Sequence, residues 1–183
     1  MNIKETPLAG LVVFESPVHS DDRGEFERVY CREQMQRLDP TLGVAQANVS
    51  TTFGRGTLRG RHVQRPPATE SKLGRCLRGR IFDVAIDLRA GSPDFLRWHA
   101  IELAEGDHRS LYLPHGFAHG FQVLSDEAQV LYFHSRAWSP AHEGGMRYDD
   151  PMVGIQWPLP VTRLSARDSS FSPLPADFRG VDA

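Results

Sequence analysis

The segment Ile81-Phe82-Asp83-Val84-Ala85-Ile86-Asp87-Leu88 is the stretch that decides the fold class. Successive side chains of a β-strand point to opposite faces, so its even-numbered side chains, all apolar, share one face. We expect this face to be core. The other face carries Asp83 and Asp87, and we expect these carboxylates to point either into a polar barrel interior or into water.

Glycine and proline recur at short intervals on both sides of this segment, and strand-like pieces lie between them. These pieces are residues 11–15, 43–50, 57–64, 73–77, 80–88, 98–103, 110–113, 117–124 and 128–134. Residues 32–38 alone read as a helix, which ends at Asp39-Pro40. Short strands of even spacing predict an all-β sandwich or barrel.

Length and composition suit one compact domain over residues 1–183, with the tail of about residues 176–183 expected to be disordered. Hydrophobic residues make up 40% of the chain and charged residues 24%. No apolar run approaches the roughly 20 residues that cross a bilayer, and the first twelve residues lack the pattern of a signal peptide. We expect a cytoplasmic protein with no membrane partner, whose Cys31 and Cys76 are buried thiols.

Positive charge is concentrated in one part of a chain whose net charge is −2. Between Arg55 and Arg80 there are eight basic residues against a single acid, Glu70. Such a local surplus favours a compact anion such as a diphosphate over nucleic acid, which needs a longer basic face. The alternative is that these arginines lie at solvated strand edges.

Two histidine-bearing segments are the most informative for function. The first is Leu58-Arg59-Gly60-Arg61-His62-Val63-Gln64, and the second is Leu113-Pro114-His115-Gly116-Phe117-Ala118-His119-Gly120-Phe121. They resemble the two half-motifs of the cupin barrel, whose metal-dependent members carry His-x-His plus a Glu in the first half. Here Gln64 replaces the second histidine, which leaves too few ligands for a transition metal. We therefore expect no metal.

The chain as a whole resembles the dTDP-4-dehydrorhamnose 3,5-epimerase family from about residue 8 to residue 173. The matching pieces follow the family's order: Arg59-Gly60-x-His62-x-Gln64, Lys72-Leu73, Phe82-Asp83-Val84-Ala85-Ile86-Asp87, Gly116-Phe117-Ala118-His119-Gly120-Phe121, Leu131-Tyr132, Asp149-Asp150-Pro151, Gly154-Ile155-x-Trp157-Pro158 and Leu164-Ser165-x-Arg167-Asp168. The resemblance implies a cupin-type jelly-roll barrel or sandwich with a few short helices.

The family's reaction needs no metal and no organic cofactor. In a 4-keto-6-deoxyhexose linked to a nucleoside diphosphate, the C3 and C5 protons are weakly acidic because both carbons flank the carbonyl. Inversion requires a base on one face, an acid on the other and stabilisation of the enolate between them. By resemblance His62 is the base, Asp168 orients and charges it, Tyr132 is the acid, and Lys72 stabilises the enolate oxygen. The implied reaction converts dTDP-4-dehydro-6-deoxy-D-glucose to dTDP-4-dehydro-L-rhamnose.

Substrate binding is assigned by the same resemblance. Arg23 and Arg59 are expected at the diphosphate or its nearby sugar, and Trp138 at the nucleobase, with Phe26 as its companion across a subunit boundary. The remaining expected contacts are Gln46, Asn48, His119, Glu143 and Arg167. Strict alternation from His62 would point Arg59 to the wrong face, and a β-bulge at Gly60 would correct this.

The chain also departs from the family's pattern. Two aromatics and a glutamate that are usual after Arg23-Gly24 are absent, and Arg28 stands where the glutamate could contact the nucleotide. The identity of the nucleobase and of the sugar is therefore left open. The alternatives are a single-centre epimerase, a 3,4-ketoisomerase, a non-catalytic sugar-nucleotide binding module and a metal-dependent cupin enzyme. Tyr132 favours inversion, because moving a proton between faces needs a second proton relay. We expect a homodimer in which the segment through Tyr30 crosses onto its partner.

Overall fold

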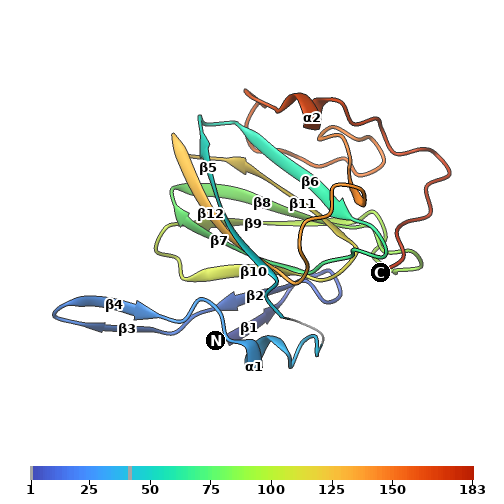
Figure 1. The fold of residues 1–183 in the computed structure, drawn as a ribbon. Helices are drawn as coiled ribbons and strands as arrows, with labels where there is room; N and C mark the ends of the chain where they lie inside the picture. The colour runs from blue at the N-terminus through green and yellow to red at the C-terminus, as the bar shows by residue number, and fades with distance from the viewer. Residues whose placement is uncertain (1, 41–42) are drawn as a thin grey trace.

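The protein is described by a computed structural model that covers residues 2–40 and 43–183. Within these ranges two antiparallel sheets face each other, and a two-stranded ribbon projects from one end (Figure 1). The expected all-β class is confirmed, although the two sheets do not close into one continuous barrel. None of the helices in the described ranges is long and apolar enough to cross a membrane.

The two sheets interleave strands from the whole chain. The six-stranded sheet runs in the order β1 (Asn2–Glu5), β2 (Val12–Glu15), β10 (Arg109–Leu113), β7 (Lys72–Arg78), β12 (Glu127–His134), β5 (Gln46–Phe53). The five-stranded sheet runs in the order β13 (Glu143–Gly145), β6 (Leu58–Gln64), β11 (Phe117–Val123), β8 (Arg80–Asp87), β9 (Trp98–Ala104). The ribbon pairs β3 (Val18–Asp21) with β4 (Gly24–Glu27), and the helices are α1 (Arg32–Met35) and α2 (Ala166–Ser169).

The central strands of the five-stranded sheet, β11 and β8, are largely buried on both faces. One face meets the other sheet in a core that includes Ile81, Ala85 and Leu111. The opposite face of the same strands packs under the C-terminal third of the chain, where Val84 and Ile86 join a second cluster. The even-numbered face of residues 81–88 is therefore core, as predicted.

The carboxylates on the odd-numbered face of β8 lie in the interior between the sheets. Asp83 and Asp87 are both fully buried, so of the two alternatives that the sequence left open the interior is the observed one and water is excluded. The C-terminal third covers the even-numbered face of β8, so the odd-numbered face can turn toward the other sheet, which buries the carboxylates. Each carboxylate has a cationic or imidazole partner, Arg89 for Asp87 and His119 for Asp83, as burial of a charge requires.

The nine predicted strands are all present, with ends that shift by a few residues. The prediction missed β1, β3, β4, β13 and α2. Strands β1, β3 and β4 are almost wholly exposed, so their sequences carry no apolar alternation, and β13 is three residues long with two glycines. The predicted helix at residues 32–38 is shorter, ending as an α-helix at Met35.

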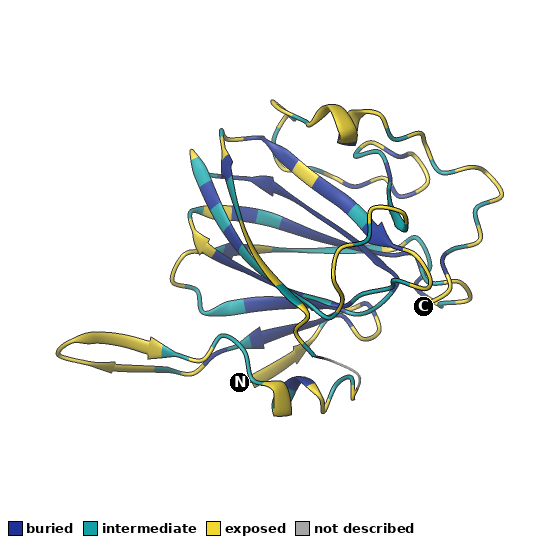
Figure 2. Ribbon diagram, in the orientation of Figure 1, coloured by how far each residue is buried: buried dark blue, intermediate teal, exposed yellow. Residues whose placement is uncertain are grey.

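The β3–β4 ribbon and the C-terminal tail differ in how they contact the rest of the fold. The β3–β4 ribbon is exposed along its length and extends away from both sheets (Figure 2). Its base is fixed by Glu27, whose carboxylate accepts from Arg75 at 2.7 and 2.8 Å. The C-terminal tail, for which the sequence suggests disorder, lies along the end of β8: Val181 is buried and its N–H donates to the carbonyl of Leu88 at 2.7 Å.

Candidate active site

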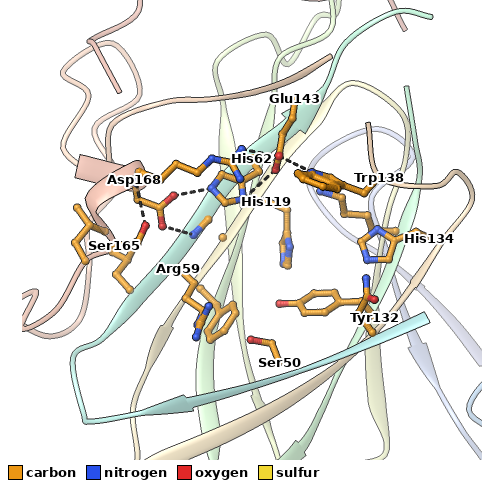
Figure 3. A pocket seen from close by; sticks show the side chains of 18 of the residues that line it. Ser50, Arg59, His62, His119, Tyr132, His134, Trp138, Glu143, Ser165 and Asp168 are labelled. Atoms are coloured by element: carbon orange, nitrogen blue, oxygen red, sulfur yellow. Dashed lines mark hydrogen bonds and ion pairs between the residues drawn. The ribbon is translucent and has the colours of Figure 1, made fainter. Parts of the chain in front are cut away.

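A pocket of about 880 Å³ lies between the two sheets, close to α2. Strands β5, β7 and β12 supply one wall, β6 and β11 supply the facing wall, and residues 163–168 close one side. Figure 3 shows the side chains that converge here from these separate elements. Of the predicted site residues, eleven line this pocket: Gln46, Asn48, Arg59, His62, Lys72, His119, Tyr132, Trp138, Glu143, Arg167 and Asp168.

His62 and Asp168 form a tight pair at one side of the pocket. His62 Nε2 lies 2.6 Å from Asp168 Oδ1, and the Gly60 N–H donates to the other carboxylate oxygen at 3.3 Å. Ser165 caps α2 by accepting from the Asp168 N–H at 3.0 Å, which fixes where this carboxylate stands. Burial acts to raise the pKa of Asp168, but the hydrogen bond and charge of His62 and the N–H of Gly60 outweigh it and lower the pKa. The carboxylate is thus held ionised against the imidazole.

A β-bulge aims both His62 and Arg59 into the pocket. The register between β6 and β11 shifts at this point, pairing His119 with His62 but Gly120 with Gly60. Gly60 has φ +93°, and a Cβ there would lie 2.5 Å from the carbonyl oxygen of His119, so only glycine fits. The predicted bulge at Gly60 is confirmed.

The extra residue of the bulge is Arg61, which is fully buried away from the pocket. Its Nε donates to the Met146 carbonyl at 3.2 Å, and its guanidinium lies 5.8 Å from the centre of the Tyr148 ring. Burial lowers the pKa of Arg61 to about 10.

Tyr132 enters the pocket from β12, on the other sheet from His62. Its ring packs edge-on against His119 at 5.6 Å, and His119 Nε2 in turn lies 2.6 Å from Asp83 Oδ1. Gly74 is the partner of Tyr132 on the neighbouring strand, where an added Cβ would lie 3.5 Å from the ring, an ordinary van der Waals contact. Burial and then the charge of Asp83 raise the pKa of Tyr132 well above 10. The phenol therefore keeps its proton at neutral pH.

Lys72 belongs to a cluster that the sequence analysis did not identify. Its Nζ lies 3.2 Å from Glu70 Oε1, and the second oxygen of Glu70 lies 2.9 Å from His134 Nδ1. Two signals could have indicated these residues. Glu70 is the only acid among the eight basic residues between Arg55 and Arg80, and His134 follows Tyr132 by two positions, on the same face of the strand.

Glu143 connects the polar groups at the mouth of the pocket. Its carboxylate forms an ion pair with Arg167 at 2.5 Å, accepts from the Trp138 indole N–H at 2.6 Å, and lies 3.5 Å from His62 Nδ1. The Gln46 side chain accepts from the Trp138 backbone N–H at 3.1 Å. The indole itself is 55% exposed, so one face is open to a ligand. Glu143 therefore links the Trp138 ring to the pocket wall that carries His62.

The three predicted site residues of the N-terminal region lie elsewhere. Arg23 and Phe26 are on the β3–β4 ribbon, where Arg23 pairs with Asp21 and Phe26 is 68% exposed, and Arg28 follows the ribbon. The pocket also has lining residues that the sequence analysis missed. These are Ser50, Thr57, Leu58, Gly60, Glu70, Gly120, Phe121, His134, Arg163, Leu164 and Ser165.

Across the described ranges, no group of three or more His, Cys, Asp or Glu side chains has a geometry suited to a metal ion. The pocket histidines instead pair one by one with carboxylates: His62 with Asp168, His119 with Asp83 and His134 with Glu70. Such an arrangement suits proton transfer at a bound organic substrate.

Comparison with known proteins gives consistent matches over nearly the whole chain. A family model described as dTDP-4-dehydrorhamnose 3,5-epimerase matches residues 5–175. A dTDP-4-dehydrorhamnose 3,5-epimerase from Sinorhizobium fredii is 39% identical over 185 residues, which cover 99% of this chain and 95% of the relative. A dTDP-4-dehydrorhamnose 3-epimerase from Streptomyces niveus is 36% identical and covers 92% of this chain and 81% of its own.

Solved structures agree with the sequence matches. The crystal structure of a dTDP-6-deoxy-D-glucose-3,5-epimerase from Legionella pneumophila, in complex with dTDP-4-keto-L-rhamnose, aligns with a TM-score of 0.88. It is 35% identical in sequence and the alignment covers 94% of this chain and 92% of that one.

Proposed function

The chain belongs to the dTDP-4-dehydrorhamnose 3,5-epimerase family, as its sequence predicts, and we propose that it inverts C3 and C5 of dTDP-4-dehydro-6-deoxy-D-glucose. The observation that carries the proposal is the pocket itself, where the His62–Asp168 pair comes from one side and the Tyr132 phenol from the other sheet. A base and an acid on separate walls can act on opposite faces of one sugar ring.

In the proposed mechanism His62 removes the proton from the carbon next to the carbonyl. The C–H bonding pair becomes the enolate, and the imidazole becomes an imidazolium that the Asp168 carboxylate, 2.6 Å away, stabilises. Lys72 presents its ammonium to the enolate oxygen. Tyr132 then delivers a proton to the other face of the same carbon, and solvent returns one proton to Tyr132 and takes one from His62. The substrate thus loses one proton and gains one, with inverted configuration.

Nucleotide binding is assigned to the open end of the same pocket. Arg59 and Arg167 supply guanidinium groups whose paired N–H donors suit a diphosphate. The half-exposed Trp138 offers a face for the base, and Gln46 and Asn48 offer polar contacts nearby.

We propose that a second copy of the chain completes this site. The β3–β4 ribbon is exposed along its length, whereas an isolated two-stranded hairpin is at best marginally stable in water. It also carries Arg23 and the apolar Phe26 away from the pocket. In a homodimer the ribbon of one subunit would reach the partner's Trp138, and Arg28 would follow it. We also propose a cytoplasmic location, as the sequence predicts.

The test is an incubation with dTDP-4-dehydro-6-deoxy-D-glucose in deuterated water, followed by NMR at C3 and C5, with His62→Ala as the control. Deuterium at both carbons, lost in the variant, is the expected result. Deuterium at one carbon would make the protein a single-centre epimerase like its Streptomyces niveus relative. If the wild type binds the ligand but incorporates no deuterium, the result would favour a non-catalytic sugar-nucleotide binding module.

A further inference from the structure

Glu70, Lys72 and His134 form a closed charge cluster on the wall that also carries Tyr132. The Glu70 carboxylate lies between the Lys72 ammonium at 3.2 Å and the His134 imidazole at 2.9 Å. All three side chains are largely buried, with exposed fractions of 7%, 11% and 15%. Lys72 and His134 are also direct partners in the register between β7 and β12, so the backbone holds the two side chains on either side of the carboxylate.

This arrangement creates an electrostatic problem for the enolate. An ammonium stabilises a developing negative charge only to the extent that its own charge is not already cancelled nearby. With His134 neutral, Glu70 and Lys72 sum to zero, and the enolate meets a cluster without net charge. With His134 protonated, the same three groups carry a net charge of +1.

We propose that Glu70 and His134 are positioning residues for Lys72, and that protonation of His134 gives the cluster the positive charge that the enolate requires. Glu70 holds the ammonium at the pocket wall, while His134 compensates the carboxylate that holds it. The inference rests on the proposed function, because it takes Lys72 to face the enolate oxygen.

The surroundings of the cluster fit this role. The titratable and charged groups that face His134 are Glu70 from the segment before β7, Lys72 from β7 and Tyr132 from its own strand, whose ring lies 5.9 Å away. Strand β5 contributes the neutral Gln46 opposite it. Burial acts to raise the pKa of Glu70, but the hydrogen bond with His134 and the charge of Lys72 outweigh it and lower the pKa. The carboxylate is therefore ionised at neutral pH, and a histidine imidazole is the kind of group in this cluster that ordinarily changes charge between about pH 5 and 8.

The test compares pH profiles of turnover at saturating substrate for the wild type, Glu70→Gln and His134→Asn, from about pH 5.5 to 9.5. Glutamine keeps an oxygen that accepts from Lys72 but carries no charge, and asparagine keeps a donor for Glu70 but never becomes a cation. His115→Asn is the matched control, since His115 also pairs with a carboxylate, Asp39 at 3.5 Å, but does not line the pocket. Proton NMR of the His134 ring, in protein without substrate, reports its titration directly.

We expect wild-type kcat to fall on the alkaline side with the same midpoint as the His134 titration. In His134→Asn the alkaline fall should vanish, with kcat lowered by about ten- to a hundredfold at low pH and KM nearly unchanged. In Glu70→Gln the cluster keeps the Lys72 charge when His134 is neutral, so kcat should fall less at alkaline pH and stay above the wild type there. The control should follow the wild-type profile.

Two results would overturn the inference. One is an alkaline limb that stays in place in both variants, and the other is a His134 ring that does not titrate over this range. Either result with deuterium exchange intact in the wild type would reject the cluster's role alone. Absence of exchange in the wild type would instead reject the proposed function together with the inference. Circular dichroism of each variant checks that the fold is retained.

Discussion

Replacing Asp168 by Asn tests the central pair of the site, because the two side chains have the same shape and differ in charge. Asp168 is 4% exposed and its two oxygens have separate partners, His62 at 2.6 Å and the Gly60 N–H at 3.3 Å. An asparagine can satisfy Gly60 only with its carbonyl oxygen, which turns its NH2 group toward His62. The imidazole would then accept at Nε2, the nitrogen that the proposed mechanism pairs with the carboxylate.

The magnitude follows from the charge that is lost. When His62 accepts a proton, the imidazolium and the carboxylate have charge centres about 4 Å apart, which attract by about 4 kcal/mol at an effective dielectric constant of about 20. Since about 1.4 kcal/mol corresponds to a factor of ten, kcat should fall by about a thousandfold. KM should change little, because the carboxylate is buried behind the histidine and acts on the protonated state.

The assay is the rate of deuterium incorporation at C3 and C5 under saturating substrate, with binding of dTDP measured separately by calorimetry. Unchanged dTDP affinity with a large loss of rate would agree with the reasoning. A loss below about tenfold would refute it, since a factor this small is less than one charge-assisted hydrogen bond usually contributes.

Three further predictions follow from other parts of the structure. Tyr132→Phe should keep deuterium exchange, because His62 can still remove and return a proton on its own face, but should lose inversion by at least about a hundredfold; NMR that resolves the product's stereochemistry checks this, and equal loss of exchange and inversion would contradict it. Gly60→Ala should lower the free energy of unfolding in urea by at least about 2 kcal/mol, because φ is +93° and the new Cβ would meet the His119 carbonyl oxygen at 2.5 Å; an unchanged midpoint would mean that the bulge is not required. Stability should also fall in acid: the pKa values of Asp168, Asp87 and Glu70 are lowered by their partners in the folded state, so the stabilisation they give is present above the ordinary values of 3.8 and 4.5 and is lost as the pH falls through the lower folded values, which urea midpoints from neutral to acid pH would measure.

How much of this site the sequence could predict depends on whether a residue's role is set locally or by a distant partner. The bulge is local: Gly60 lies two residues before His62, and a bulge there is expected once the resemblance places both Arg59 and His62 in the pocket. The nine core strands could likewise be predicted locally, because each segment shows the apolar periodicity of a strand in its own residues. The exposed ribbon carries no such pattern, which is why β3 and β4 were missed.

Side chains whose state is set by another strand could not be predicted from their own segment. Asp83 gives the clearest case, since its alternation allowed either water or the interior, and the choice depends on residues 146–155, which cover the opposite face of the sheet. Glu70 and His134 are separated by 64 residues and meet only because β7 and β12 are neighbours in the six-stranded sheet. The family motif identifies Lys72 as a single residue. In our proposal the net charge that faces the enolate also depends on Glu70 and His134, which lie outside the motif. Pairing across strands, more than any single residue, therefore decides how the pocket is charged when the substrate reacts.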